Sequence, residues 1–222
     1  MAPLLKIDFV SDVACPWCAV GLASLEQALH QLDGKVRAEL HFQPFELNPQ
    51  MGPEGQDVAE HLAQKYGSTP QQQQANWEAL RQRAAAVGVT FRREGRGRVW
   101  NTFDAHRLLH WAGEQGPAAQ LALKKALLVA YFGEGRGLAD HAVLLQAVAD
   151  AGLDAAQART ALDNDTYAAE VREQEAFYTS HGIHAVPSVI INEQHLIQGG
   201  QPPEVFAQAL RQIADQAAQP AS

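Results

Sequence analysis

The first forty residues follow a pattern of apolar and polar positions that predicts a strand, a helix and a second strand. Residues 4–10 form a short apolar run with Ile, Phe and Val, which is typical of a buried strand. Apolar residues then recur at helical spacing from Pro16 until Asp33 and Gly34, where we expect the helix to end. Residues 36–42 alternate apolar and polar side chains, as a half-buried strand does. The chain therefore opens as a β-α-β unit.

The middle of the chain, from residue 51 to residue 164, has no pattern that indicates a strand. Its apolar positions have helical spacing, and the segments begin at Asp, Ser or Thr and end at Gly, the residue types that cap helix ends. The helices expected here are 57–66, 70–87, 102–114, 117–132, 140–151 and 154–162. We expect an all-helical insert.

The last part of the chain returns to mixed structure. The expected elements are a helix (166–181), a hairpin of two strands (188–191 and 195–198) and a final helix (202–216). Residues 1–50 and 165–222 would then form one discontinuous α/β domain with a mixed sheet, interrupted by the helical insert 51–164. The predicted order is β-α-β, insert, α-β-β-α.

Composition and charge narrow the function classes. The 222 residues are 46% apolar and carry a formal net charge of −8, so a basic face for nucleic acid is not expected. No apolar run approaches the roughly 20 residues that cross a membrane. Lys6, Asp8 and Asp12 interrupt the N-terminal apolar stretch, which does not resemble a signal peptide. We expect a cytoplasmic protein, in a reducing compartment.

The only two cysteines, Cys15 and Cys18, lie where the first strand leads into the helix. A helix N-terminus carries partial positive charge and free N–H groups, which favour a thiolate over a thiol. Cys15, nearest the helix end and expected nearest to solvent, would be the nucleophile. Cys18 lies one turn later, within reach to resolve a mixed disulfide on Cys15. Pro16 suits the first helical position and stiffens the turn.

Two other interpretations of the cysteines are weaker. A structural zinc site needs four ligands, and neither a second cysteine pair nor a nearby histidine cluster is present in the sequence. His106 and His110 are four residues apart in a predicted helix, but no carboxylate stands at a metal-motif spacing. Reduced cysteines that simply fill the core are the third reading. A CxxC in a β-α-β frame favours redox chemistry, and no metal site is expected.

A second motif precedes the predicted hairpin. Pro187 stands directly before strand 188–191, and we expect it in cis beside the cysteine pair. Val186 would then offer its backbone N–H and C=O to an extended substrate. The alternative is a proline that only begins an edge strand. His184, three residues before Pro187, would either tune the thiolate or lie in an exposed loop.

These motifs together resemble a known superfamily. The segments Asp-Phe-Val-Ser-Asp-Val-Ala-Cys-Pro-Trp-Cys and Gly-Ile-His-Ala-Val-Pro-Ser-Val resemble DsbA-like thioredoxin-fold proteins, and segments 43–49, 101–109 and 130–136 resemble the FrnE-type branch. The resemblance implies a thioredoxin-like fold with an inserted helical domain, thiol–disulfide exchange, Cys15 as nucleophile, Cys18 as resolving thiol and a cis Pro187. Related 2-hydroxychromene-2-carboxylate isomerases and kappa-class glutathione transferases typically have serine at the first cysteine position and use glutathione. Retention of both cysteines favours redox turnover here.

For each of the other candidate substrate-binding residues, a purely structural role is the alternative. Trp17 would give a substrate an apolar contact or pack at the helix start, and Asn48 would line a cleft or form a turn before a proline. Gly200 and Gln201 open the last helix, as an anion site or a tight turn. The basic run 92–98 would bind carboxylates, such as those of glutathione, or form a solvated loop.

The leading hypothesis is a thiol–disulfide oxidoreductase that acts on protein or small-molecule thiols and disulfides. It needs no resident cofactor, and glutathione is a candidate co-substrate. The alternatives are a glutathione-dependent isomerase or transferase and a redox-switched, chaperone-like binding module. The resemblance to this family implies a homodimer, although the sequence shows no recognisable interface.

Overall fold

The computed structural model describes residues 2–217 and contains a four-stranded sheet. The strand order is β2-β1-β5-β6, with β1 parallel to β2 and antiparallel to β5, and with β5 antiparallel to β6. The strands are β1 (Leu4–Ser11), β2 (Arg37–Pro44), β5 (Ser188–Ile191) and β6 (His195–Gln198). The mixed sheet predicted from the sequence is confirmed, and the hairpin strands have the predicted bounds.

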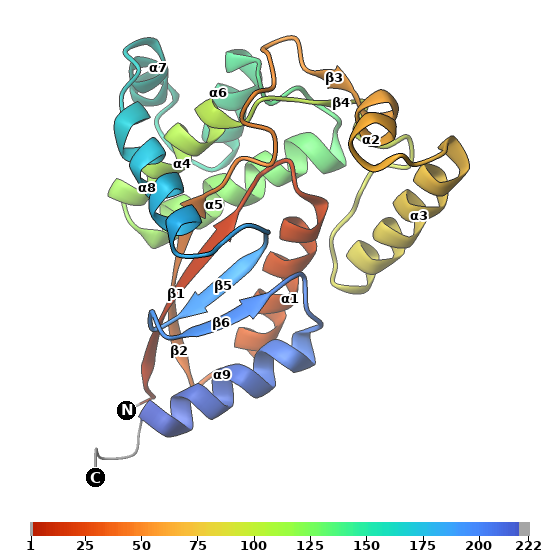
Figure 1. Cartoon of the computed structure of the whole chain (residues 1–222). Helices are drawn as coiled ribbons and strands as arrows, with labels where there is room; N and C mark the ends of the chain where they lie inside the picture. Colours follow the sequence, from red (N-terminus) through yellow and green to blue (C-terminus); the bar gives the residue numbers. More distant parts are fainter. Residues whose placement is uncertain (1, 218–222) are drawn as a thin grey trace.

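Two helices pack together along this sheet. They are α1 (Pro16–Gln31), which joins β1 to β2, and α9 (Pro203–Ala217), which ends the described chain. Figure 1 shows α1 beside the strands and α9 crossing below them. The helical period of α1 places Val20, Leu22 and Leu25 in the core, where each is at most 2% exposed. This β-α-β frame places the N-terminus of α1 at the C-terminal end of β1.

The inserted segment is largely helical, as predicted. Its helices are α2 (Val58–Tyr66), α3 (Pro70–Ala86), α4 (Phe103–Glu114), α5 (Pro117–Leu128), α6 (His141–Asp150) and α7 (Ala155–Asp163), followed by α8 (Ala168–Ser180). Polar side chains cap the N-termini of several of these helices. The Asp57 carboxylate accepts hydrogen bonds from two N–H groups of α2, and at the start of α3 Thr69 forms a capping box with Gln72.

The expectation of an all-helical insert is wrong at one strand pairing, and one expected helix changes type before its end. Two two-residue strands, β3 (Gln56–Asp57) and β4 (Arg98–Val99), pair antiparallel to each other. Two residues are too few to produce a strand period in the sequence, so this pairing left no signal. The helix expected to continue to residue 132 instead ends as α5 and widens into a π-helical turn, η1 (Val129–Gly133).

One buried glutamine fixes the insert against the sheet. The side chain of Gln120 on α5 accepts a hydrogen bond from the Phe42 N–H at 2.8 Å and donates to the Phe42 carbonyl at 3.0 Å. It also donates to the Leu109 carbonyl of α4 at 3.1 Å. Because β2 is an edge strand, these bonds satisfy backbone groups that the sheet leaves open. The insert is therefore anchored to the strand beside β1.

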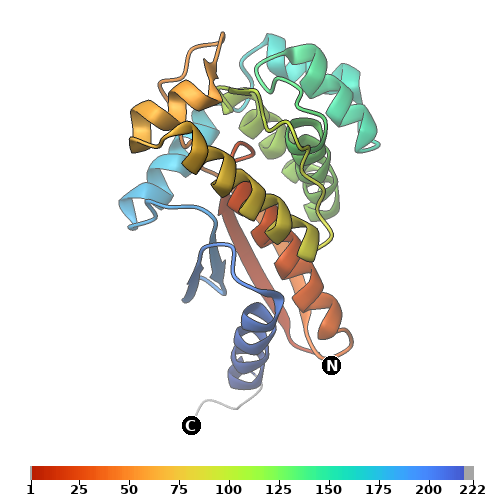
Figure 2. The same cartoon turned by 90° about the vertical axis from the view of Figure 1, so that its right-hand side faces the viewer.

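The sheet and the insert share one hydrophobic core. A continuous cluster of buried side chains runs from Phe9 of β1 and Leu25 of α1 to Leu108 of α4 and Leu127 of α5. Figure 2 shows α3 lying alongside α1, and residues of the two helices are in contact. Among residues 2–217, no helix combines the length and the apolar character that a membrane crossing requires.

Candidate active site

The turn between β1 and α1 is built on one aspartate. The Asp12 carboxylate accepts hydrogen bonds from the N–H groups of Ala14 at 3.0 Å and Leu47 at 2.8 Å, and the Cys15 N–H donates to the Asp12 carbonyl at 3.2 Å. These bonds hold the turn and the segment after β2 together. They place Cys15 at the N-cap of α1, with Pro16 as the first helical residue, as predicted.

The two cysteines are free thiols at the beginning of α1. The Cys15 Sγ lies 3.7 Å from the carbonyl oxygen of Val186, and the Val186–Pro187 peptide bond is cis, which confirms that expectation. Cys15 is only 5% exposed and Cys18 is fully buried. Cys15 is thus the cysteine nearer to solvent, as expected, and it is accessible as a lining residue of a cavity.

The surroundings separate the acidities of the two thiols. A hydrogen bond from the Cys18 thiol is the largest influence on Cys15 and, with backbone N–H groups, lowers its pKa in spite of burial. Burial is the largest influence on Cys18 and raises its pKa well above the usual range, and the neighbouring Cys15 raises it further. Cys15, the position expected for the nucleophile, is therefore the more readily ionised of the two thiols.

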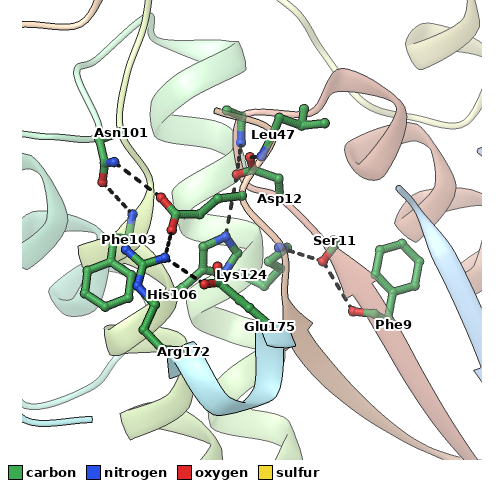
Figure 3. Close-up of polar contacts among 12 residues, drawn as sticks. Phe9, Ser11, Asp12, Leu47, Asn101, Phe103, His106, Lys124, Arg172 and Glu175 are labelled. Carbon is green, nitrogen blue, oxygen red and sulfur yellow. Dashed lines mark hydrogen bonds and ion pairs between the residues drawn. The ribbon is translucent and has the colours of Figure 1, made fainter. Parts of the chain in front are cut away.

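A group of buried charged residues lies behind the turn (Figure 3). Asp12 is 1% exposed, His106 is 2% exposed, and the His106 Nε2 lies 3.6 Å from the Asp12 Oδ1. Burial raises the pKa of Asp12, but His106 and the Leu47 and Ala14 N–H groups outweigh it, so this pKa lies below its usual value. The carboxylate is ionised beneath the cysteines.

Lys124 of α5 belongs to the same buried region. It is fully buried, and its Nζ donates to the Ser11 Oγ at the end of β1, at 2.9 Å. Burial lowers the pKa of Lys124 to about 8, while Cys18, Asp12 and Cys15 act in the opposite direction. A lysine in such a position titrates near neutral pH.

A second set of charges joins the segment after β2 to α8. Arg172 of α8 pairs with the buried Glu46 and, at 2.7 Å, with Glu175, and its guanidinium lies 3.7 Å from the centre of the Phe103 ring. The Asn101 amide donates to Glu46 at 3.3 Å. This cluster, drawn in Figure 3, fixes the segment that continues to Leu47 and Asn48.

A cavity of about 760 Å³ opens over Cys15. Its walls come from the β1–α1 turn, the segment after β2, helices α2 and α3, the strand β4 with the loop before it, and Val186. The lining residues are Ala14, Cys15, Pro16, Trp17, Leu47, Asn48, His61, Leu62, Lys65, Tyr66, Ser68, Gln73, Asn76, Trp77, Ala79, Leu80, Arg83, Arg96, Val99 and Val186. Aromatic and aliphatic side chains dominate, which is typical of a small-molecule site.

The charged residues that line this cavity are all cations, although the protein is acidic. They are Lys65, Arg83 and Arg96, and no Asp or Glu lines the cavity. Arg96 also donates to the carbonyl of Ala14, beside Cys15, at 3.1 Å. Burial, Lys65 and Arg96 lower the pKa of His61 below its usual value, as a positive local potential does. The cavity favours anions.

The structure brings some predicted binding residues together and leaves others apart. Pro16, Trp17, Asn48 and Val186 line the cavity, and Arg96 is the member of the basic run that reaches it. Pro187 is buried beside Val186.

The remaining predicted residues do not line the cavity. His184 is exposed outside it. The Cα of Gly200 lies against the Trp17 backbone, since an added Cβ would meet the Trp17 oxygen at 3.0 Å, and the Gln201 amide donates to the Gln198 carbonyl at 2.8 Å. In this structure Gly200 and Gln201 make a tight turn, and an anion-binding role for them stays a prediction.

Several residues of the site were not singled out from the sequence. Lys65 and Arg83 occupy ordinary polar positions of the largely polar surfaces of α2 and α3, so nothing in the sequence distinguishes them. Lys124 did leave a signal: it shares a helical face with Gln120, Leu127 and Leu128, all of them buried. A charged residue on an apolar face is informative when it is buried.

Comparisons with known proteins agree with this fold. The family model of the DSBA-like thioredoxin domain matches residues 6–211. A probable DsbA oxidoreductase of Streptomyces coelicolor is 36% identical, with a TM-score of 0.88 over 98% of this chain and 93% of that one. An uncharacterised protein of Bacillus subtilis, YwbO, is 27% identical over 93% of this chain and 96% of its own. The cytosolic disulfide reductase DsbM of Pseudomonas aeruginosa, whose structure includes GSH, is 18% identical, with a TM-score of 0.64 over 95% and 99% of the two chains.

Proposed function

Because this chain belongs to the family of DsbA-like thioredoxin domains, we propose that it is a thiol–disulfide oxidoreductase that works through Cys15 and Cys18. One observation carries the assignment. Cys15, with its lowered pKa, lines the cavity at the N-terminus of α1 and has its sulfur 3.7 Å from the Val186 carbonyl. A substrate sulfur can therefore approach a thiolate whose partner thiol is in the next helical turn.

The reaction follows from the different acidities of the two thiols. The Cys15 thiolate attacks a substrate disulfide, forms a mixed disulfide and releases one substrate sulfur as a thiolate. Cys18 then loses its proton and attacks the Cys15 sulfur, which releases the second substrate sulfur. The protein ends with a Cys15–Cys18 disulfide, and two electrons have passed to the substrate. The same steps in reverse oxidise a dithiol.

The cavity favours a small anionic thiol or disulfide over an extended protein segment. Its aromatic wall accepts an apolar part, and Lys65, Arg83 and Arg96 attract carboxylates. Glutathione has this chemistry, and DsbM has been crystallised with GSH. We place the reaction in the cytoplasm, the compartment in the name of DsbM, because a reducing environment keeps a lone cysteine pair available for turnover.

Variants of the two cysteines test the proposal. We expect Cys15→Ser to lower the reduction of glutathione disulfide by at least about 10³-fold, because the nucleophile is lost. We expect Cys18→Ala to accumulate a mixed disulfide on Cys15, detected by intact-mass spectrometry. Exchange at full rate by Cys15→Ser would refute the assignment.

The same variants separate the alternatives. A glutathione-dependent isomerase or transferase would keep turning over in Cys18→Ala with saturable glutathione binding. A binding module would show client binding that depends on the cysteine state, with no catalytic exchange by the unmodified protein.

A further inference from the structure

Lys124 occupies a position that packing does not explain. Its side chain is fully buried, and among residues 2–217 the hydrogen-bond partner of its Nζ is the Ser11 Oγ at 2.9 Å. The Phe42 ring lies beneath it, with the ring centre 5.5 Å from Nζ. An ammonium has three N–H donors, and burying one with a single hydrogen-bond partner is unfavourable. A leucine or methionine would fill the same space without this cost.

The ionisable groups around Lys124 are those of the cysteine site. Cys18 is its strongest electrostatic partner, followed by Asp12 and Cys15, all from the β1–α1 turn and the start of α1. From α4, His106 lies against Asp12 at 3.6 Å. From β2, it is the apolar ring of Phe42 that faces Nζ, and the buried side chains of α6 are apolar. The insert thus buries an amine against Ser11, the chain neighbour of Asp12, and the backbone N–H of Asp12 in turn acts on the Cys18 sulfur.

The resolving step requires a proton acceptor. Cys18 is fully buried and its pKa is raised, so little of its thiol ionises on its own near neutral pH. Asp12 is a poor acceptor, because its oxygens already hold the N–H groups of Ala14 and Leu47 and its pKa is lowered. The pKa of Lys124 is about 8, and a base works best when its pKa lies near the operating pH.

We propose that the neutral amine of Lys124 accepts the Cys18 proton when Cys18 resolves the mixed disulfide, a role that rests on the proposed oxidoreductase function. The S–H bond of Cys18 breaks and its proton passes to Nζ, which becomes an ammonium. The Cys18–Cys15 bond forms, the bond between Cys15 and the substrate sulfur breaks, and the substrate leaves as a thiolate. The ammonium returns its proton to solvent before the next turnover.

The two half-steps can be followed separately with 5,5′-dithiobis(2-nitrobenzoate) and the reduced protein in a stopped-flow spectrometer. Each released nitrothiobenzoate absorbs near 412 nm. A first phase that depends on reagent concentration reports the attack by Cys15. A second phase that does not depend on it reports resolution by Cys18. We expect the second rate to rise about tenfold per pH unit at low pH and to level off at or below about pH 8, where the amine is neutral.

Three variants define the role. We expect Lys124→Met to slow the second phase at least tenfold at neutral pH and to lose the plateau, so that its rate still rises above pH 9. Lys124→Arg keeps the positive charge but cannot take up a proton, so it should behave as Lys124→Met does. Lys125→Met is the matched control, because Lys125 is half exposed and pairs with Glu26 on the surface. Its profile should equal that of the unmodified protein.

Two results would overturn the assignment. One is a second phase of the unmodified protein with no levelling between pH 6 and pH 9, which needs no variant and stands even if the substitutions unfold the chain. The other is a folded Lys124→Arg protein with an unchanged profile, which would make Lys124 an electrostatic group only. Failure of the proposed function looks different, because no nitrothiobenzoate, or only one equivalent, would then be released.

Discussion

The cationic cavity makes a quantitative prediction about substrate charge. Arg83 of α3 is exposed and lines the cavity, so Arg83→Gln removes one charge with little effect on packing. A sphere of 760 Å³ has a radius of roughly 6 Å, so a bound carboxylate lies about 6–11 Å from a cation on the wall. At about 8 Å, two unit charges interact by about 0.5 kcal/mol in bulk water and about 2 kcal/mol at an effective dielectric constant near 20.

Screening by salt reduces these values at an exposed site, so we take about 0.3–0.7 kcal/mol for each ligand charge. Glutathione disulfide carries two net negative charges, which gives about 0.6–1.4 kcal/mol, or roughly 3–10-fold in kcat/KM. Bis(2-hydroxyethyl) disulfide carries no charge and should change less than about 1.5-fold. The loss for glutathione disulfide should also shrink as the salt concentration rises toward about 0.5 M.

The assay is the reduction of each disulfide by the protein under a common regenerating thiol, with kcat/KM measured at low and high salt. Arg159→Gln is the matched control, since Arg159 is an exposed cation on α7 that does not line the cavity. Equal losses for the charged and neutral disulfides would show that Arg83 shapes the wall rather than attracting anions. If neither substrate loses kcat/KM, the positive charge of the cavity does not take part in substrate recognition.

Further predictions concern the framework that holds the site. Asp12 has a lowered pKa, so its contribution to stability is present above its usual pKa near 4 and is lost as the pH falls through its pKa in the folded protein. The free energy of unfolding in urea, measured from pH 2 to pH 7, should therefore fall less steeply at acid pH in Asp12→Asn than in the unmodified protein. Gly21→Ala should lower the unfolding free energy by about 1–3 kcal/mol in chemical denaturation, because its Cβ would lie 3.0 Å from the Pro187 ring. Gln120→Ala should cost about 2–4 kcal/mol, since both backbone polar groups of Phe42 lose their partner, and an unchanged thermal midpoint would contradict this.

The sequence predicted the elements in which apolar and polar residues alternate with a regular period. Residues 4–10 and 36–42 carry strand patterns, and the hairpin at 188–191 and 195–198 has its turn at Asn192 and Glu193, both with positive φ. The strands β3 and β4 are too short to carry a period. The π-helical turn η1 depends on how the backbone after α5 packs, which hydrophobic spacing does not encode.

The residues of the candidate site divide in the same way, into those with a local sequence pattern and those that only tertiary packing brings together. Cys15 and Cys18 form a CxxC motif that is recognisable in the sequence, and Pro187 was found through its position before a strand. Lys124, in contrast, is 106 residues from Cys18 along the chain, and it joins the buried ionisable groups near the cysteines only because α5 packs against β2. Such proximity is a tertiary property: the sequence contains a lysine on the helical face of Leu127 and Leu128, but it does not indicate which groups lie near that lysine.

The positive charges around the cysteines all come from the insert. The β1–α1 turn supplies the two sulfurs and the negative Asp12, whereas Lys65, Arg83 and Arg96 enter from the outer wall. Lys124, on α5, does not line the cavity and is fully buried.

A thiolate formed at Cys15 adds a second negative charge next to Asp12, and Asp12 by itself raises the Cys15 pKa. Within the insert, Lys124 lowers the pKa of Cys18, and other residues of the insert form the outer wall of the cavity. One inserted segment therefore borders both the cavity over Cys15 and the buried Cys18 thiol. Substitutions in the insert should therefore change substrate preference and thiol reactivity together, although the sulfur atoms lie in the other part of the chain.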